Sequence, residues 1–135
     1  MKLSTRDAVS YFTNPDPKRT GLLIYGADAM RVALKRQEVI AALLGPNAEE
    51  EMRLARMSGT EVRKDPAMLL DAIKSQGFFP GPRVAFVEDA NDTIAQIVIS
   101  ALADWQAGDA QVIVTAGALK KTSRLRKEFE THPNA

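Results

Sequence analysis

The sequence predicts a three-layer α/β domain in which a parallel β-sheet carries helices on both faces. Apolar runs of strand length alternate with segments of helical periodicity along the chain, which is the pattern of repeated βαβ units. The runs over 21–26 and 111–117 are largely apolar, as strands buried on both faces of a parallel sheet are. The 135 residues match the size of one domain, so we expect a single domain over 1–135 with right-handed crossovers.

Composition limits the classes of function. The 18 Lys and Arg residues nearly balance the 17 Asp and Glu residues, unlike the composition of a strongly basic nucleic-acid binder or a strongly acidic protein. The lack of Cys excludes disulfides, thiol catalysis and cysteine metal sites. No apolar run approaches the ~18 residues of a membrane span. The N-terminus also lacks a signal-peptide core, so we expect a soluble cytoplasmic protein without membrane contact.

The N-terminal part predicts a short helix followed by a buried strand. Ser4, with Asp7 three residues later, resembles a capping box at a helix start. The two prolines within 14–17 end this helix, because a proline disfavours helical backbone in the residue before it. The strand over 21–26 follows.

A long helix is predicted over 29–44. Asp28 is a good N-cap for it, and Gly45 with Pro46 forms a strong stop. Apolar residues recur at helical spacing, which predicts a buried stripe. The stripe consists of Met30, Ala33, Leu34, Ile40, Ala41 and Leu44.

The middle of the chain predicts an exposed strand, a loop and a helix. Apolar and basic residues alternate over 52–57, as in a strand with one solvent-facing side, and 58–60 reads as a loop. Asp65 as N-cap and Pro66 at the first helical position mark a helix start, and this helix ends near Gln76. Its predicted buried residues are Met68, Leu69, Ala72 and Ile73.

The C-terminal part predicts two more strands, each followed by a helix. The strands cover 83–89 and 111–117. Asp92 is the expected cap of the helix between them, and the last helix spans about 122–131. The apolar positions of these two helices are Ile94, Ile97, Val98, Ala101, Leu102, Trp105, Leu125 and Phe129.

The stretch 76–83 holds the most distinctive local pattern. Phe78 and Phe79 lie among glycines and prolines that include Pro80 and Gly81, between a predicted helix and a predicted strand. Loops lie at the surface, so one interpretation is an exposed aromatic knob that binds a partner protein. The other is that both rings fold back onto the core, as most Phe side chains do.

The junction between the first strand and the long helix does not predict a nucleotide site. Ligands of open α/β sheets bind at the carboxyl ends of the strands, so this is where a phosphate loop would lie. The junction Gly26–Arg31 has one glycine, no Lys followed by Ser or Thr, and Asp28 where a phosphate would approach. It matches neither a P-loop nor G-x-G-x-x-G.

Two further sets of residues are of types that can carry chemistry. Glu88 and Asp89 end a strand, and together with Thr115 and Lys120 they resemble the acidic site of a receiver-type signalling domain. A receiver also needs acids after its first strand, but Asp28 is better explained as a helix cap, and Glu88 and Asp89 are better explained as solvation at a strand end. His132 has no acid–base partner in view, so no catalytic role is expected for it.

A basic cluster surrounds the start of the last helix. It comprises Lys120, Lys121, Arg124, Arg126 and Lys127. Cations at a helix N-terminus oppose the helix dipole, so the cluster is a candidate contact for an acidic partner or a phosphate. The alternative is a solvated face whose charge Glu128 and Glu130 offset.

Several segments together resemble the delta subunit of bacterial DNA polymerase III, the clamp-loader subunit that opens the sliding clamp. Residues 23–28 (LIYGAD) are similar to its opening L-x-Y-G-x-D, and 77–84 (GFFPGPRV) to its S-L-F-G-x-R-R-V. Residues 117–127 (GALKKTSRLRK) are similar to its G-x-L-x-K-x-S-x-L-x-K. The ending at 133–135 resembles a connection to a further strand, so the chain is expected to be the N-terminal piece of a three-domain subunit.

The resemblance implies a fold, a partner and a site. The family's first domain is a P-loop NTPase-like, AAA+-type module without a functional Walker A motif. In the family a hydrophobic pair plugs into a pocket of the sliding clamp. The implied contact residues here are Phe78, Phe79, Pro80, Gly81 and Arg83. Phe78 and the prolines depart from the usual residues, and the prolines would stiffen the knob and lower its ordering cost.

We therefore expect a non-catalytic replication protein that binds the clamp and stabilises its open ring, as a component of a DNA polymerase holoenzyme. No cofactor or metal is expected. Contact with other loader subunits would use domains absent here, and contact with DNA would be indirect or weak. Two alternatives from other classes stay open: a small nucleotide-binding α/β enzyme domain and a receiver-type signalling domain.

Overall fold

The sheet is four-stranded and entirely parallel, as predicted. The computed structural model describes residues 7, 10–12, 15, 19–45, 53–74, 83–106, 109–120 and 122–131. The strands are β1 (Gly21–Tyr25), β2 (Leu54–Ser58), β3 (Val84–Ala90) and β4 (Gln111–Ala116). Their order is β1-β4-β3-β2, so β1 and β2 lie at opposite edges and β3 and β4 occupy the centre.

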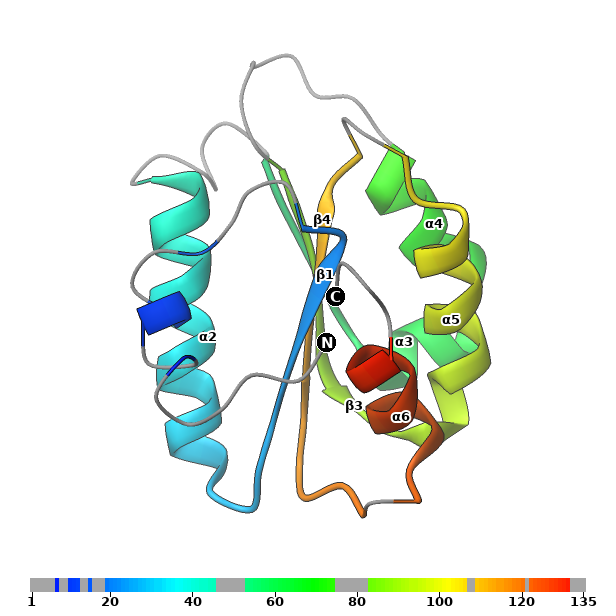
Figure 1. The fold of residues 1–135 in the computed structure, drawn as a ribbon. Coiled ribbons are helices and arrows are strands. Elements are labelled where there is room, and N and C mark those ends of the chain that lie inside the picture. Colours follow the sequence, from blue (N-terminus) through cyan, green and yellow to red (C-terminus); the bar gives the residue numbers. More distant parts are fainter. Residues whose placement is uncertain are drawn as a thin grey trace.

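Helices cover both faces of this sheet, which gives three layers (Figure 1). The helices are α2 (Ala29–Leu44), α3 (Gly59–Lys64), α4 (Ala67–Lys74), α5 (Ala95–Ala103) and α6 (Arg124–Thr131), with a 3₁₀ turn η1 (Asp92–Ile94) before α5. Helix α2 lies on one face, together with the short helical segment that includes 10–12, and α3, α4, α5 and α6 lie on the second face. The chain runs from one edge strand, β1, to the other edge strand, β2, and then turns back towards β1 through β3 and β4. Right-handed connections therefore place the two sets of helices on opposite faces.

Each face has its own hydrophobic core. Under α2, Phe86 and Ile113 of the central strands pack against Val39, Ile40 and Leu43. On the other face, side chains of the sheet pack against the four shorter helices. The fully buried members there include Val62, Leu69, Ile73, Val98 and Leu125.

Helix α2 has the predicted limits but a different buried face. The Asp28 side chain accepts a hydrogen bond from Arg31 N, and Gly45 ends the helix at φ 78°. Most of the predicted stripe is wrong, because Met30 is 74% exposed, Leu34 is 58% exposed, and Ala33 and Ala41 are also exposed. Only Ile40 and Leu44 of the predicted set are buried. The sheet instead meets a row that begins at Val32 and ends at Leu43 and Leu44, so two apolar rows share one helix.

The residues after β2 form a helix where a loop was predicted. Ser58 accepts a hydrogen bond from Glu61 N (3.1 Å) and donates its own N–H to the Glu61 carboxylate (3.3 Å). This capping box starts α3 directly at the end of the strand. The S-x-x-E spacing was present in the sequence. Helix α4 follows Asp65 and Pro66 as predicted, with Leu69 and Ile73 buried.

Asp92 does not cap the helix that follows it. The Asn91 side chain accepts the hydrogen bond from Thr93 N (2.9 Å), and a 3₁₀ turn precedes α5. The apolar stripe of α5 is confirmed at Ile94, Val98 and Leu102, which are buried.

Part of the predicted first helix lies within the described residues. In the predicted first helix, Asp7, Ser10, Tyr11 and Phe12 are helical, and Phe12 packs against the core under α2. In the part of the chain that the structure describes, no helix is long and apolar enough to cross a bilayer.

Gly59 makes a close backbone approach that yields a stability test. A Cβ there would lie 2.7 Å from the backbone oxygen of Asp89, whereas a Cβ at Gly117 would meet nothing within 4 Å. We expect Gly59→Ala to lower the free energy of unfolding by about 2 kcal/mol through overpacking, although alanine normally favours a helix. Gly117→Ala should change it by less than about 0.5 kcal/mol. Urea unfolding measures both, and equal values for the two variants would contradict the close approach.

Candidate functional site

The predicted partner-binding stretch lies between α4 and β3. Phe78, Phe79, Pro80 and Gly81 fall outside the described residues, so their predicted exposure stays a prediction. Arg83 is described and directly precedes β3. The stretch therefore joins the main body at the amino end of the central strands.

Both flanks of this stretch are fixed to the turn before β4. On the α4 side, Ile73 O accepts from Ala110 N (3.1 Å), and Lys74 Nζ donates to Asp104 O (2.9 Å). On the β3 side, Arg83 O accepts from Gln111 N (2.9 Å). Because Ile73 and Arg83 bond to the neighbouring residues Ala110 and Gln111, the two flanks lie close together.

Asp109 is the ionic centre of that turn. Its carboxylate pairs with Lys74 Nζ and accepts from Gln106 N (2.8 Å), while Trp105 Nε1 donates to Ala110 O (2.8 Å). Partial burial disfavours the charged carboxylate. The bonds from Lys74 and Gln106, with the charges of Lys74 and Arg83, outweigh this, and the pKa of Asp109 lies below its usual value.

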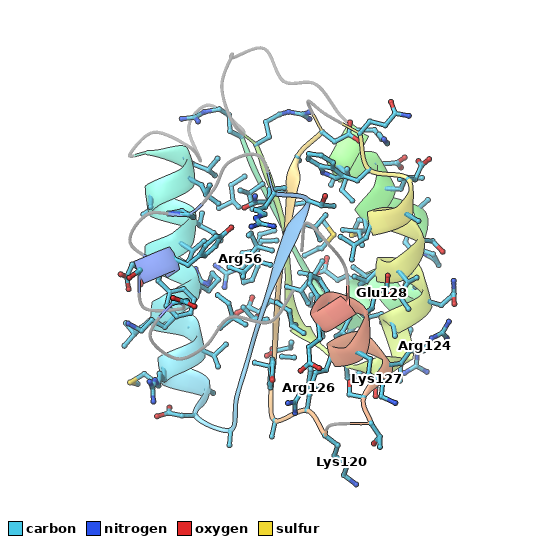
Figure 2. The ribbon with its side chains drawn as sticks, in the orientation of Figure 1. Arg56, Lys120, Arg124, Arg126, Lys127 and Glu128 are labelled. Atoms are coloured by element: carbon cyan, nitrogen blue, oxygen red, sulfur yellow. The ribbon has the colours of Figure 1, made fainter. Side chains whose placement is uncertain are left out.

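The basic cluster lies at the other end of the sheet. Lys120 follows β4, and Arg124 and Lys127 are exposed on α6 (Figure 2). Lys121 is outside the described residues. Strand β3 has seven residues, so its two ends are roughly 20 Å apart. Arg83 and the basic cluster therefore belong to two separate surfaces.

Asp92 places a negative charge at the start of α6, where the sequence shows a basic cluster. Its Oδ1 accepts from Ser123 Oγ (2.7 Å) and from Leu125 N (3.1 Å). The hydrogen bond from Ser123 has the largest effect. With the amides of Leu125 and Arg124 it outweighs the opposing effect of burial, so the pKa of Asp92 is lowered. The carboxylate thus offsets the dipole cost of the neighbouring cations.

One member of the basic cluster is occupied within the fold. Arg126 Nε pairs with Glu130 (2.8 Å), its Nη1 donates to Leu119 O (3.2 Å), and its guanidinium lies 5.1 Å from the centre of the Tyr25 ring. Arg124 bonds to the neutral side chain of Gln96 and keeps its charge uncompensated by that contact. Lys120, Arg124 and Lys127 are exposed, whereas Arg126 is only partly exposed, so a charged partner would meet the first three more readily.

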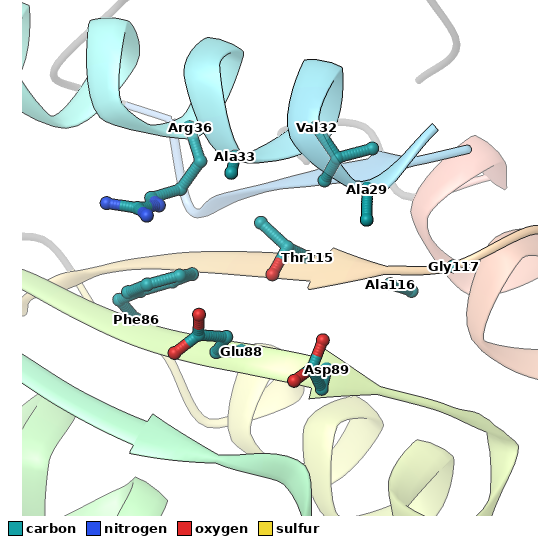
Figure 3. A pocket seen from close by; sticks show the side chains of 10 residues that line it. All are labelled: Ala29, Val32, Ala33, Arg36, Phe86, Glu88, Asp89, Thr115, Ala116 and Gly117. Carbon is teal, nitrogen blue, oxygen red and sulfur yellow. The ribbon is translucent and has the colours of Figure 1, made fainter. Parts of the chain in front are cut away.

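A small pocket lies between α2 and the carboxyl ends of β3 and β4 (Figure 3). Its volume is about 180 Å³, and it is lined by Ala29, Val32, Ala33, Arg36, Phe86, Glu88, Asp89, Thr115, Ala116 and Gly117. Arg36 lies 4.8 Å from the centre of the Phe86 ring. Its buried Nε has no hydrogen-bond partner in the described part of the chain. The sequence interpretation included Glu88, Asp89 and Thr115 but missed Arg36, because an arginine within a helix carries no distinctive signal.

Glu88 and Asp89, the acidic pair at this pocket, differ in their backbone conformation and in their contacts. Glu88 accepts hydrogen bonds from Arg56 Nε (3.1 Å) and Nη2 (2.9 Å), which couples β3 to β2. Asp89 has φ 55°, and the register of β3 on β4 shifts between Val87 and Ala90, so a bulge turns the strand here. Within the described ranges, no three His, Cys, Asp or Glu residues are grouped so as to hold a metal ion.

The pocket is poorly matched to a nucleotide. Small-molecule sites usually have roughly 300–1,000 Å³, more than the 180 Å³ found here. The Asp28 carboxylate already accepts from Arg31 N (3.2 Å) at the start of α2, where a phosphate would otherwise bind. Comparisons of the sequence with protein-family models and with curated proteins found no match. The geometry itself therefore has to support any functional proposal.

The Asp92 contacts predict a pH-dependent contribution to stability. Because the folded-state pKa is lowered, this contribution is present above the unfolded value of ~3.9 and is lost as the pH falls through the folded-state pKa. Asp92→Ala should cost about 1 kcal/mol at pH 7 and less near pH 2. Asp71→Ala on the exposed side of α4 is the control, with almost no expected change. Urea unfolding across this pH range decides, and a cost for Asp92→Ala that is constant with pH would contradict the assignment.

Proposed function

We propose that this chain is the N-terminal, non-catalytic domain of a clamp-loader delta subunit, which binds the sliding clamp and stabilises its open ring. The observation that carries the proposal is the position of the described residues on either side of 75–82, which include Lys74 and Arg83. This stretch resembles the clamp-binding motif, and both of its flanks are held at one turn at the amino end of the sheet. If the stretch forms the surface loop that its sequence predicts, fixed ends make it a suitable carrier for a small aromatic knob.

The start of α2 supports the same proposal. The fold is an α/β sheet of the kind that often binds nucleotides at the carboxyl ends of its strands. At the first of these junctions, the Asp28 carboxylate accepts the hydrogen bond from Arg31 N that a phosphate would otherwise accept. An AAA+-like module without a working phosphate loop would have this α/β sheet and this capped start of α2, and it would need no cofactor.

The proposed mechanism is a shift of an equilibrium. A binder opens a ring only to the extent that it binds the open interface more tightly than the closed one. In this proposal Phe78 and Phe79 provide the anchor, and Pro80, Gly81 and Arg83 shape its approach. The basic cluster at the opposite end would contact an acidic partner or a phosphate, with DNA bound weakly if at all. The setting is the cytoplasm, in assembly with other loader subunits through domains beyond this one.

The decisive test is binding of the chain to the sliding clamp of its own organism. We expect Phe78→Ala with Phe79→Ala to weaken binding by about 100-fold, because buried aromatic anchors dominate such interfaces. Met30→Ala with Leu34→Ala is the matched control, since it also removes two large apolar side chains, both of which are exposed on α2. The control should bind as the unmodified chain does. Clamp affinity that survives loss of both phenylalanines would move the contact elsewhere, and no binding by a folded chain would overturn the proposal.

A nucleotide-binding α/β domain remains the second candidate, because the pocket beside α2 lies at the carboxyl ends of two strands. The receiver-type alternative is disfavoured by strand order. In the flavodoxin-like order 2-1-3-4-5 the first two strands are neighbours, whereas β1 and β2 lie at opposite edges of the described sheet.

The nucleotide candidate predicts saturable thermal stabilisation by ATP, GTP or NAD. We expect no shift of the melting temperature with any of the three, because the pocket is small and Asp28 occupies the start of α2. A ligand that binds the folded state at 100 times its Kd would add about 2.7 kcal/mol, which a thermal scan detects readily. Saturable stabilisation would favour the enzyme class over the clamp loader.

A further inference from the structure

We infer that the pocket between α2 and the carboxyl ends of β3 and β4 is a binding site for a small zwitterion. The ligand's carboxylate bonds to Arg36, its ammonium group bonds to Asp89, and a short hydrocarbon chain joins the two. This site is independent of the proposed clamp contact, because the pocket lies at the carboxyl ends of the central strands and Arg83 lies at their amino ends.

The pocket exists because the first half of α2 presents small residues toward the sheet. Its lining residues Ala29, Val32, Ala33 and Arg36 follow the spacing i, i+3, i+4, i+7 and so share one helix face. The buried residues of α2 begin only at Val39, in the second half of the helix. The volume left open is about 180 Å³. A cavity of roughly 150 Å³ can hold benzene, so this pocket suits a ligand of roughly six to nine non-hydrogen atoms.

Arg36 provides the end of the pocket that binds a carboxylate. Figure 3 shows its side chain reaching from α2 toward Phe86, and its guanidinium carbon lies 4.8 Å from the centre of that ring. The buried Nε has no hydrogen-bond partner in the part of the chain that the structure describes. Glu88, two positions after Phe86 on β3, is already bound by Arg56 Nε (3.1 Å) and Nη2 (2.9 Å). A ligand carboxylate that reaches the Arg36 guanidinium from the pocket would supply a counter-charge and charge-assisted hydrogen bonds.

A bulge brings Asp89 into the same pocket as Glu88. Successive side chains of a regular strand point to opposite faces, so two neighbours do not normally line one pocket. Asp89 has φ 55°, and the register of β3 on β4 shifts between Val87 and Ala90. A second, exposed carboxylate therefore lines the α2 side of the sheet beyond Glu88 (Figure 3). Bulges often re-aim a side chain in this way next to a functional site.

The two charged ends of the pocket are spaced for a short ligand. Arg36 lies over Phe86, and Asp89 comes three residues after Phe86 on β3, which corresponds to roughly 10 Å of strand. A hydrogen bond of about 3 Å at each end leaves room for a short hydrocarbon chain between the ligand's charged groups. Thr115, buried on β4, adds a hydroxyl group to the wall between these ends. A simple carboxylate would match Arg36 alone, whereas a zwitterion matches both ends.

The test is an NMR titration of the full chain with γ-aminobutyrate, beside butyrate and butylamine. We expect γ-aminobutyrate to shift the Arg36 Nε–H signal and the amide signals of Asp89 and Thr115 saturably. Butyrate should bind about 3-fold more weakly, because it lacks the contact with the exposed Asp89, and butylamine about 10-fold more weakly. Butyrate that binds as tightly as γ-aminobutyrate would overturn the zwitterion as ligand. No saturable shift with any of the three would overturn the site.

Two variants test the charged ends separately. Arg36→Met removes the guanidinium and keeps a long side chain over Phe86, and we expect affinity for γ-aminobutyrate to fall about 10-fold. Arg31→Met is the matched control, because Arg31 is exposed on the same helix and does not line the pocket. Asp89→Asn keeps a residue type that tolerates positive φ, and it should remove the preference for γ-aminobutyrate over butyrate. Equal affinities of Arg36→Met and Arg31→Met would overturn the role of Arg36.

Ala33→Leu tests the space in the pocket and leaves both charges in place. Ala33 is exposed on α2, so the larger side chain should fill the pocket without disturbing the core and should abolish binding of γ-aminobutyrate. Ala41→Leu, exposed on the same helix outside the pocket, should bind as the unmodified chain does. Should Arg36→Met fold poorly, Ala33→Leu decides, and unchanged binding by it would overturn the site. No clamp is used in these titrations, so this site and the proposed function can each fail alone.

Discussion

The pairing of β3 with β4 is the interaction on which the rest of the structure depends. Among the described strands, β1 pairs only with β4 and β2 only with β3, so both edges of the sheet are attached through this central ladder. All six residues of β4 are buried, and Phe86 and Val87 of β3 lie in cores on opposite faces. A polar change in this ladder would therefore disturb both hydrophobic cores at once.

The central ladder also separates the two surfaces of functional interest. The partner-binding stretch is attached at the amino end of β3, and the basic cluster follows the carboxyl end of β4. Each end is organised by one aspartate that was not assigned this role from the sequence: Asp109 at the first and Asp92 at the second. In both places a carboxylate from one connection fixes a different segment, so the ends of the domain are stabilised by contacts between segments far apart in sequence.

Much of the fold was predictable because its signals are local. The limits of α2 follow from Asp28 and Gly45, and the start of α4 follows from Asp65 and Pro66. The buried face of α2 was not predictable from periodicity, because Met30 and Leu34 form a second apolar row that the sheet does not cover. The role of Asp92 was missed for a related reason. A carboxylate beside a helix start looks like its cap, and only the tertiary structure shows that Asn91 caps the 3₁₀ turn before α5 while Asp92 bonds to α6.

The candidate site was predictable only in part. The phenylalanine pair and the basic cluster are visible in the sequence because they are contiguous. The attachment of Lys74 to Asp109 joins residues 35 positions apart, and no spacing rule connects them. The pocket residue Arg36 was missed in the same way, because its partner Phe86 belongs to a strand much later in the chain.

The position of Trp105 has a practical consequence. It is the only tryptophan of the chain, and its indole N–H donates to Ala110 O, beside Asp109 and next to the bond from Ala110 N to Ile73 O. Tryptophan emission from this protein therefore originates beside Asp109 and Lys74, at the amino end of the central strands. The domain thus carries an optical probe at one end of the sheet, while the basic cluster lies at the other, so emission would distinguish a ligand that binds at the first end from one that binds at the second.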